Sequence, residues 1–471
     1  MLIETGGTFA RAGYCHCAFE SPSHASTSTP RTQTHHPPER QDSRLHPRTL
    51  LLTNGLIRIA SAASGQLFAF VLAERVGARA STGALLVGLT GASFYVVELA
   101  GAPVAGHLAD SVGHARVLRW GPLFGVVAML TGALAALGQF SLLTLGVVLV
   151  AARVCEGASA ACAVPATLAL LAQETEGSGP KRLRLTGLFE ITSLIGLILG
   201  YALAGTGWDA LGPSVFLTLP VVYGAAWFLV RERGTVGVAR RADSEHRART
   251  PVWRTLRSLA TQRGAVSFAV AWLAVNAVVG VWMQQSPYLF KLPMRSSSQA
   301  LVGGYSASVI GMIFGVWGIT FLAGIALWSF AAPRWPRRRI LGTALAGMGV
   351  VVATLWLVNH GAPRMLLIVG IIAVMVESGF TPAAFAHLAD LTDVDDTSRG
   401  TLMGTYSVLL GAGQLIGVVA GAPFAARWQM DGVLAVTALL AVVAMVGVAG
   451  MRSHDVARSD REPGDPADSS A

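Results

Sequence analysis

The sequence contains twelve apolar segments that are each long enough to cross a lipid bilayer. About 18 or more mainly apolar residues in a helix span roughly 30 Å of hydrocarbon. Backbone groups in lipid must find hydrogen-bond partners within the protein, so apolar runs of this length form helices rather than isolated strands. We therefore predict an all-α integral membrane protein with twelve transmembrane helices. The segments are residues 50–73, 82–108, 115–137, 142–172, 184–206, 212–231, 264–289, 304–331, 338–358, 364–390, 400–425 and 432–451.

The composition also indicates a lipid environment. Hydrophobic residues make up 53% of the 471 residues and charged residues only 13%, with 53 glycines. A soluble protein of this length needs more charge to cover its surface, whereas small residues let membrane helices approach closely. This composition excludes an ordinary soluble enzyme.

The distribution of basic residues predicts the orientation. With both termini inside, the cytoplasmic connections carry 19 Lys and Arg residues and the outer connections carry six. Basic residues favour the cytoplasmic side, so we expect a multi-pass protein of the cell (inner or plasma) membrane with both termini cytoplasmic. Topology thus accounts for the net charge of +9, and no nucleic-acid partner is expected.

Polar stretches divide the chain into five parts. Residues 1–48 are rich in Pro, Ser, Thr, His and Arg and predict a disordered cytoplasmic tail, with a start codon inside this stretch as the alternative. A basic cytoplasmic linker, 232–263, separates six-helix bundles at 49–231 and 264–451, and 452–471 forms a second polar tail.

The two halves resemble each other in sequence. PATLALLAQ from Pro165 matches PAAFAHLAD from Pro382, at an offset of 217 residues. The same offset places Gly187, Gly196 and Gly200 on Gly404, Gly413 and Gly417. A parallel repeat of six helices predicts two pseudo-repeat bundles that rock around a central site.

Two motifs resemble signatures of the major facilitator superfamily. GHLADSVGHARVL, between the second and third segments, is similar to G-x-x-x-D-(R/K)-x-G-(R/K)-(R/K) through Gly106, Asp110 and Gly113, with Arg116 trailing. RVCEG in the fourth segment resembles the family's second signature at Arg153 and Gly157. The resemblance covers about 50–451 and implies a transporter whose first, fourth, seventh and tenth helices line a central cavity. A third signature, typical of proton-driven exporters, is mostly absent, because Tyr201 stands at the place of its proline.

The first motif predicts a conformational latch formed by Gly106, Asp110, Gly113 and Arg116. Asp110 lies opposite the expected start of the eleventh helix at Gly400, and a helix N-terminus stabilises a nearby carboxylate. The alternative is an ordinary solvated aspartate in a turn.

Six ionisable residues lie at membrane depth, where each charge costs about 2.5–3.5 kcal/mol. They are the cations Arg58 and Arg153 and the carboxylates Glu98, Glu156, Glu190 and Glu377. Two cations cannot neutralise four carboxylates, so at least two of the carboxylates are expected to be protonated or to titrate during a transport cycle.

Spacing suggests partners for these charges. Arg153 and Glu156 are three residues apart and can pair within one helix. Arg58 and Glu98 lie at similar depths, about 15 and 18 Å from the cytoplasmic boundary. Glu190 is shallow, and snorkelling to nearby basic residues is its main alternative role. Glu377 has no basic residue within one turn and is our first choice for proton coupling, with a neutral, hydrogen-bonded glutamate as the alternative.

Substrate contacts are expected from Asn276, Trp282 and Gln284 on the seventh helix and from Tyr95 on the second. Asn276 and Gln284 are eight residues apart and share a helical face. Polar groups beside aromatic rings suit an amphipathic organic molecule. Packing or anchoring at the lipid interface is the alternative for each residue.

Together these features predict proton-coupled secondary transport of a small organic solute by a monomer, preferably export of a drug-like or secondary-metabolite compound. Uptake of a nutrient by symport or uniport is the alternative, and a non-transporting membrane sensor or scaffold is a hypothesis from another class. The sequence lacks a Walker motif and a nucleophile–base set, so we expect no enzyme, no cofactor and no metal. Small-molecule substrate, protons and the lipid bilayer are the expected partners.

Overall fold

The computed structural model describes residues 45–77, 79–175, 179–231, 264–296, 298–331, 335–392 and 399–451. Every secondary-structure element within these ranges is helical. The expected linker and C-terminal tail, and nearly all of the expected N-terminal tail, lie outside the described residues.

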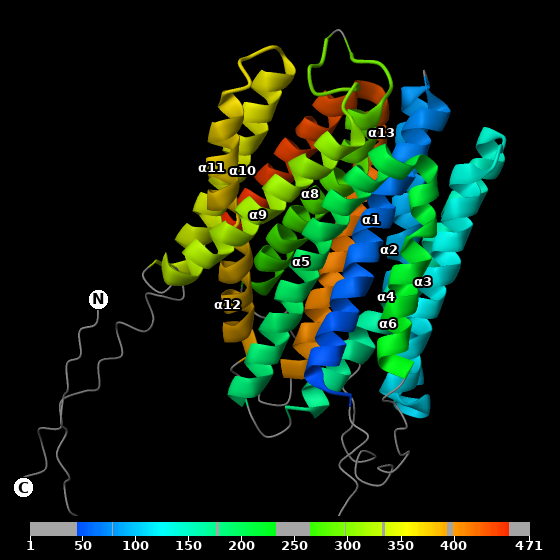
Figure 1. The fold of residues 1–471 in the computed structure, drawn as a ribbon. Helices are drawn as coiled ribbons and strands as arrows, with labels where there is room; N and C mark the ends of the chain where they lie inside the picture. The colour runs from blue at the N-terminus through cyan, green and yellow to red at the C-terminus, as the bar shows by residue number, and fades with distance from the viewer. Residues whose placement is uncertain are drawn as a thin grey trace, which may run out of the picture. The chain divides into compact units, whose positions relative to one another are not determined.

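The described helices correspond to the expected membrane spans (Figure 1). Ten are long and apolar enough to cross a membrane, and one shorter apolar helix is Leu219–Arg231. The N-terminal half contains α1 (Pro47–Val76), α2 (Ala80–Val112), α3 (His114–Leu137), α4 (Leu142–Gln173), α5 (Gly179–Leu211), η2 (Gly212–Leu217) and α6 (Leu219–Arg231). The C-terminal half contains α8 (Ala265–Lys291), α9 (Ala307–Ala331), α10 (Arg337–Asn359), α11 (Leu366–Glu377), α12 (Phe380–Thr392) and α13 (Arg399–Gly450). The prediction of an all-α membrane protein is confirmed.

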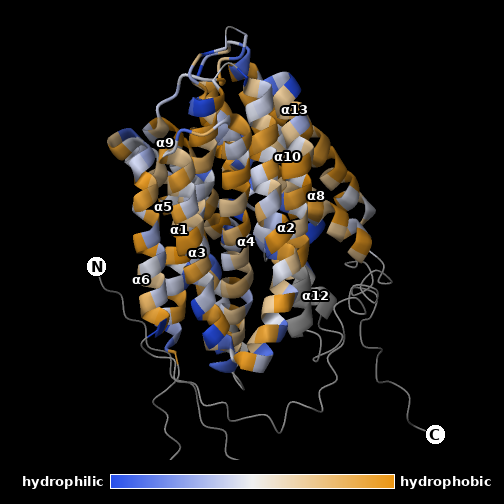
Figure 2. Ribbon diagram, turned by 90° about the vertical axis from the view of Figure 1, so that its right-hand side faces the viewer, coloured by the Kyte–Doolittle hydropathy of each residue, from blue (hydrophilic) through white to orange (hydrophobic). Residues whose placement is uncertain are grey.

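Large apolar side chains cover the helix surfaces that face away from other helices. Leu143, Val221, Phe330 and Val446 are all more than half exposed. Hydrophilic residues gather at the helix ends, while apolar residues dominate the lengths between them (Figure 2). This pattern suits a bilayer, because lipid tails cover the apolar surface that water would penalise.

The turn between α2 and α3 is as tight as its sequence predicts. Gly113 is the single residue between the two helices, and its backbone φ of 101° lies in a region that L side chains rarely adopt. Its N–H donates to the carbonyl of Ala109 at 2.9 Å. Glycine is therefore required for α2 to end and α3 to begin at adjacent positions.

The span expected over 364–390 is present as the apolar segment Leu366–His387, in which a turn at Ser378–Gly379 separates α11 from α12. The indole Nε1 of Trp328, on α9, donates to the carbonyls of Met375 at 3.1 Å and Val376 at 3.2 Å. The same indole packs against the backbone of Gly379, where a side chain would collide with it. A donor from another helix thus satisfies carbonyls at the end of α11.

One other expected boundary differs. The segment expected as a helix over 212–231 begins as the 3-10 helix η2, whose first residue, Gly212, has a positive φ of 57°. The segments expected at 400–425 and 432–451 are two helices, as expected, and they meet within α13 at a kink at Gln429, the one described non-glycine residue with positive φ.

The repeat seen in the sequence is also present in the packing. Gly196 and Gly200 of α5 contact the backbone of α1 near Ile59. Their counterparts Gly413 and Gly417, in the first part of α13, contact α8 near Ala277 in the same way. The α1–α5 crossing and the α8–α13 crossing are therefore equivalent, which matches the offset in the sequence.

The halves contact each other through α1 with α8, α2 with α8 and α13, and α5 with α9. We call the end at which α1, α5 and α8 finish and α2 and α9 begin the junction end; it is the upper end in Figure 1. At this end the Tyr288 hydroxyl donates to the Ala80 carbonyl at 2.9 Å, and the Gln285 amide donates to the Ala84 carbonyl at 3.1 Å. The turn at Gly113 lies at the opposite end.

Candidate functional site

The centre of the N-terminal half contains a buried ion pair. Arg153 Nη1 lies 2.7 Å from Glu156 Oε2 on the same helix, α4, as the three-residue spacing predicts. The two residues are only 3% and 1% exposed. Two charges placed so deep are tolerable because they neutralise each other.

Residues on α1 complete the coordination of this pair. The hydroxyls of Ser61 and Ser64 donate to Glu156 Oε1 at 2.8 and 2.6 Å, so the carboxylate accepts three hydrogen bonds. The guanidinium of Arg153 lies 4.5 Å from the Phe94 ring centroid and 5.7 Å from that of Phe68. Such cation–π contacts stabilise a cation that has left water. The pair therefore ties α1, α2 and α4 together.

A small polar cavity adjoins the ion pair. It has a volume of about 10 Å³ and lies among side chains of α1, α4 and α6, including Arg58, Ser61, Glu156, Ser159 and Tyr223. A cavity of this size and polarity is large enough for about one water molecule. The Ser159 hydroxyl is buried without a hydrogen-bond partner among the described residues, which a water in the cavity would satisfy.

Arg58 lies within electrostatic range of two further carboxylates, Glu98 and Glu190. Glu98 interacts electrostatically with Arg58 and Arg153, and Glu190 interacts with Arg58. The expected Arg58–Glu98 proximity is therefore present without a direct hydrogen bond among the described contacts. Glu190 is exposed on α5, as expected for a side chain that can reach the interface.

Glu377 differs from the other three carboxylates. It is the last residue of α11, directly before the break at Ser378–Gly379, and its backbone packs against Gly347 of α10. Its half-buried side chain has no ion pair or hydrogen bond within the described part of the chain. At the offset of 217 residues between the two halves, Glu377 corresponds to Ala160, which packs against Tyr95 and Phe94.

Two of the four predicted substrate contacts meet between the halves. The Tyr95 hydroxyl of α2 interacts with the Gln284 side chain of α8, and both residues are buried. Tyr95 also lies within electrostatic range of Glu98, Arg153 and Arg58. Two of the predicted solute contacts, Tyr95 and Gln284, thus lie close to three of the intramembrane charges.

The other two predicted contacts have partners inside the C-terminal half. Asn276 donates to the Trp272 carbonyl of its own helix at 2.9 Å. Trp282 donates from Nε1 to the Thr437 hydroxyl at 2.9 Å, in the last part of α13. Their roles in solute binding stay predictions, and these contacts favour packing instead.

Several polar residues of the site were missed by the sequence analysis. Ser61 and Ser64 were overlooked because serine is common in membrane helices. Gln66 is fully buried on α1, and neither atom of its amide has a described hydrogen-bond partner. In the packing, Gly196 contacts Arg58 and Gly413 contacts Asn276, so α1 and α8 correspond at an offset of 218 residues and Gln66 aligns with Gln284. This correspondence is the signal that could have identified Gln66.

The predicted latch lies at the end opposite the junction end. Asp110 Oδ1 is 3.6 Å from Nε2 of His114, across the Gly113 turn. Arg116 is exposed, and no described side chain lies within 4 Å of the place that a Cβ on Gly106 would take. The side chains of residues 399–407, where the latch partner is expected, lie outside the described part of the chain, so the latch stays a prediction.

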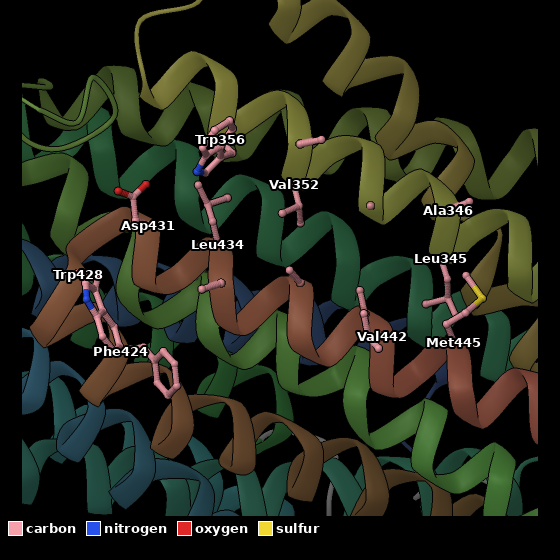
Figure 3. Close-up of a pocket in the computed structure, with 15 residues that line it drawn as sticks. Leu345, Ala346, Val352, Trp356, Phe424, Trp428, Asp431, Leu434, Val442 and Met445 are labelled. Atoms are coloured by element: carbon pink, nitrogen blue, oxygen red, sulfur yellow. The ribbon is translucent and has the colours of Figure 1, made fainter.

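A larger hollow lies elsewhere, between α10 and the last part of α13 (Figure 3). It measures about 890 Å³ and is lined mainly by apolar residues such as Val352, Leu434 and Met445. Its carboxylate, Asp431, already accepts a hydrogen bond from Asn359 at 2.8 Å and pairs with His360 at 3.4 Å. It holds none of the intramembrane charges, so it is not our candidate site.

Comparisons with known proteins agree with the fold. The family model described as Major Facilitator Superfamily matches residues 50–303 and 296–469. Among solved structures, the nucleoside transporter NupG (D323A mutant) is 11% identical, with a TM-score of 0.66 over 86% of this chain and 99% of that chain. A D-xylose-proton symporter is 15% identical, with a TM-score of 0.63 over 86% and 97%. A bacterial homolog of the human lysosomal transporter Spinster is 14% identical, with the same TM-score and coverage. Comparison with curated proteins finds no match.

Proposed function

Because the chain belongs to the major facilitator superfamily and is thus a membrane transporter rather than an enzyme, we propose that it moves a small organic solute by proton-coupled alternating access. The observation that carries this proposal is the meeting of Tyr95 and Gln284, one from each half, within electrostatic range of Arg58, Glu98 and Arg153. A solute bound between these residues would lie beside groups whose charge can change.

The charge balance supports proton coupling. Arg153 and Glu156 neutralise each other, so Arg58 alone remains for Glu98, Glu190 and Glu377. An uncompensated charge at membrane depth costs several kcal/mol, which favours protonation of a carboxylate that has no cation. We assign coupling to Glu377, because it lacks an ion pair among the described residues and ends a helix at a break. Glu98 is the second candidate.

For the direction, we propose export of a drug-like or secondary-metabolite compound. Phe94 and Tyr95 place aromatic surface beside polar groups, an arrangement that suits amphipathic molecules. Uptake by symport or uniport is the alternative, and one of the structurally similar proteins is a D-xylose-proton symporter. Monomeric function in the cell membrane, with cytoplasmic termini, belongs to the same proposal.

Reconstituted proteoliposomes that contain a pH-sensitive dye test this proposal. A panel of nucleosides, sugars and amphipathic drugs is screened for counterflow and for solute-induced proton movement. Glu377→Gln should retain counterflow and lose proton-driven accumulation, because glutamine mimics the protonated acid but cannot release a proton. Glu174→Gln, at the C-terminal end of α4, is the matched control and should behave like the wild type.

Each other outcome has a defined meaning. Proton-driven accumulation by Glu377→Gln at the wild-type rate would refute the assignment of proton coupling to Glu377. Loss of proton-driven accumulation in Glu98→Gln would then assign coupling to Glu98. Solute flux without proton movement would identify a uniporter. Absence of flux for every compound would favour the sensor hypothesis.

A further inference from the structure

A carboxylate from the N-terminal half caps a helix of the C-terminal half at the junction end. Asp209, near the end of α5, accepts the N–H of Ala307 on Oδ1 at 3.1 Å and the N–H of Ser308 on Oδ2 at 2.8 Å. These are the first two residues of α9. Both oxygens of one side chain are therefore committed to the other half of the protein.

The first turn of α9 depends on this cap. The first four N–H groups of a helix have no partner within the helix. Ser306 precedes the helix: its carbonyl accepts the first regular bond of the helix, from Ile310 at 3.1 Å, and its hydroxyl accepts from Val309 at 3.4 Å. The N–H groups of Ala307 and Ser308, at the first two positions of the helix, are the ones that Asp209 binds. The partial positive charge of the helix N-terminus adds to the stabilisation of the carboxylate.

The ion pair of Glu74 and Lys291 is a second link between the halves, and Trp208, the residue next to Asp209, supports it from within the N-terminal half. Trp208 donates from Nε1 to Glu74 Oε1 at 3.0 Å, and the same oxygen lies 3.3 Å from Nζ of Lys291. Glu74 belongs to α1 and Lys291 to α8. Asp209 and Trp208, which are consecutive on α5, thus each support one of the two charged contacts between the halves.

Close packing makes the Asp209 contact sensitive to separation of the halves. A side chain at Gly205 would collide with the Ala307 carbonyl, and one at Gly311 would collide with the Tyr201 carbonyl. One turn further along α9, the Tyr201 and Phe314 rings stack with centroids 4.7 Å apart. Hydrogen bonds of about 3 Å weaken steeply with distance, so a modest displacement of α9 from α5 breaks both of them.

We propose that Asp209 is a gate-locking residue: its carboxylate holds the junction end together in one conformation and releases α9 when that end opens. The inference rests on the alternating access of the proposed function, but it requires neither a particular solute nor proton coupling. Release leaves the N–H groups of Ala307 and Ser308 to water, to which the Asp209 side chain is already exposed. Asp209 thereby acts at the end opposite the predicted Asp110 latch.

Distance measurements between spin labels test this role directly. Labels at Leu143 in α4 and Met365, next to α11, are placed on the two halves at the junction end, where these side chains are 80% and 82% exposed. The protein is otherwise free of cysteine, full length and reconstituted in lipid nanodiscs. Asp209→Asn should raise the population with the longer distance on the order of tenfold, because the amide presents a donor to one N–H and lacks the charge.

Asp431→Asn is the matched control. Asp431 is also a carboxylate at the junction end, but its described partners, Asn359 and His360, belong to the same half. Its substitution should leave the distance distribution unchanged. Asp209→Glu keeps the charge one methylene further out and should give an intermediate shift.

Amide hydrogen exchange provides a second readout. Peptides that cover Ala307 and Ser308 should exchange faster in Asp209→Asn than in the wild type, whereas peptides from the middle of α9 should not change. Unchanged distances together with unchanged exchange would overturn the gate-locking role. Because neither measurement uses a solute or a proton gradient, failure here is distinct from failure of the transport proposal.

Discussion

The buried pair of Arg153 and Glu156 gives the sharpest prediction for stability. Glu156→Gln keeps the size of the side chain and removes its charge, so the buried cation Arg153 loses the carboxylate that pairs with it directly. Glutamine can still accept from Ser61 and Ser64 through its amide oxygen. The amide nitrogen, however, then faces the guanidinium of Arg153. Both groups are hydrogen-bond donors, so they cannot bond to each other.

The magnitude follows from these contacts. Removal of one partner of a buried pair costs about 3–5 kcal/mol, because the other charge is left uncompensated. The Phe94 and Phe68 rings contact the cation in the wild type and in the variant alike, so they do not change this cost. Glu98, which lies within electrostatic range of Arg153, brings the cost toward the lower end of the range. We expect a net loss near 3 kcal/mol, equivalent to roughly a hundredfold shift in the unfolding equilibrium.

A double-mutant cycle separates this cost from loss of packing. Reversible unfolding in bicelles is measured for the wild type, Glu156→Gln, Arg153→Met and the double variant. The double variant should be more stable than Glu156→Gln alone, because it contains no unpaired buried charge. Glu174→Gln, at the end of the same helix, should change stability by less than about 0.5 kcal/mol. Equal costs for Glu156→Gln and Glu174→Gln, or strictly additive single effects, would refute the reasoning.

Four further predictions concern topology and local structure. Cysteines placed at Ser244 and Ser296 in a cysteine-free background should be labelled from opposite sides of the membrane, and labelling from one side would reject the orientation. Gly113→Ala should lower stability by about 1–2 kcal/mol in unfolding measurements, because alanine is strained at a φ of 101°; an unchanged stability would contradict the tight turn. Trp328→Phe should loosen the α11–α12 break by removing the donor to two carbonyls, visible as faster amide exchange there, and equal exchange would show that the indole is dispensable. Asp110→Asn should alter the accessibility of reporter cysteines without altering insertion, whereas unchanged accessibility and flux would leave Asp110 as a turn residue.

Residues close together in the chain allowed the strongest predictions from sequence. Helix geometry determines which residues share a face, so the three-residue spacing of Arg153 and Glu156 was sufficient to predict their pair. A single glycine between two apolar runs likewise predicted the turn at Gly113. The spans followed from hydropathy, because the bilayer imposes one length on every helix that crosses it.

Contacts between distant segments required the tertiary structure. The rotation of α1 against α4 determines that Ser61 and Ser64, rather than other polar residues of α1, reach Glu156. The break after Glu377 depends on the indole of Trp328 on α9, which binds the Met375 carbonyl 47 residues further along the chain. Trp282 shares a helix with Gln284, yet its indole reaches the last part of α13 instead of the neighbourhood of Tyr95.

The sequence by itself determined the helices, their repeat, the charges within the membrane and the pair that lies within one turn. Only the tertiary structure decided which helix faces meet, and therefore that Tyr95 meets Gln284 and that Asp209 caps α9 across the two halves. The physical reason is the range of the interactions. Periodicity and spacing act within a few residues along one helix, whereas contacts between helices depend on how each helix is rotated and displaced against its neighbours, which the packing of many side chains sets together.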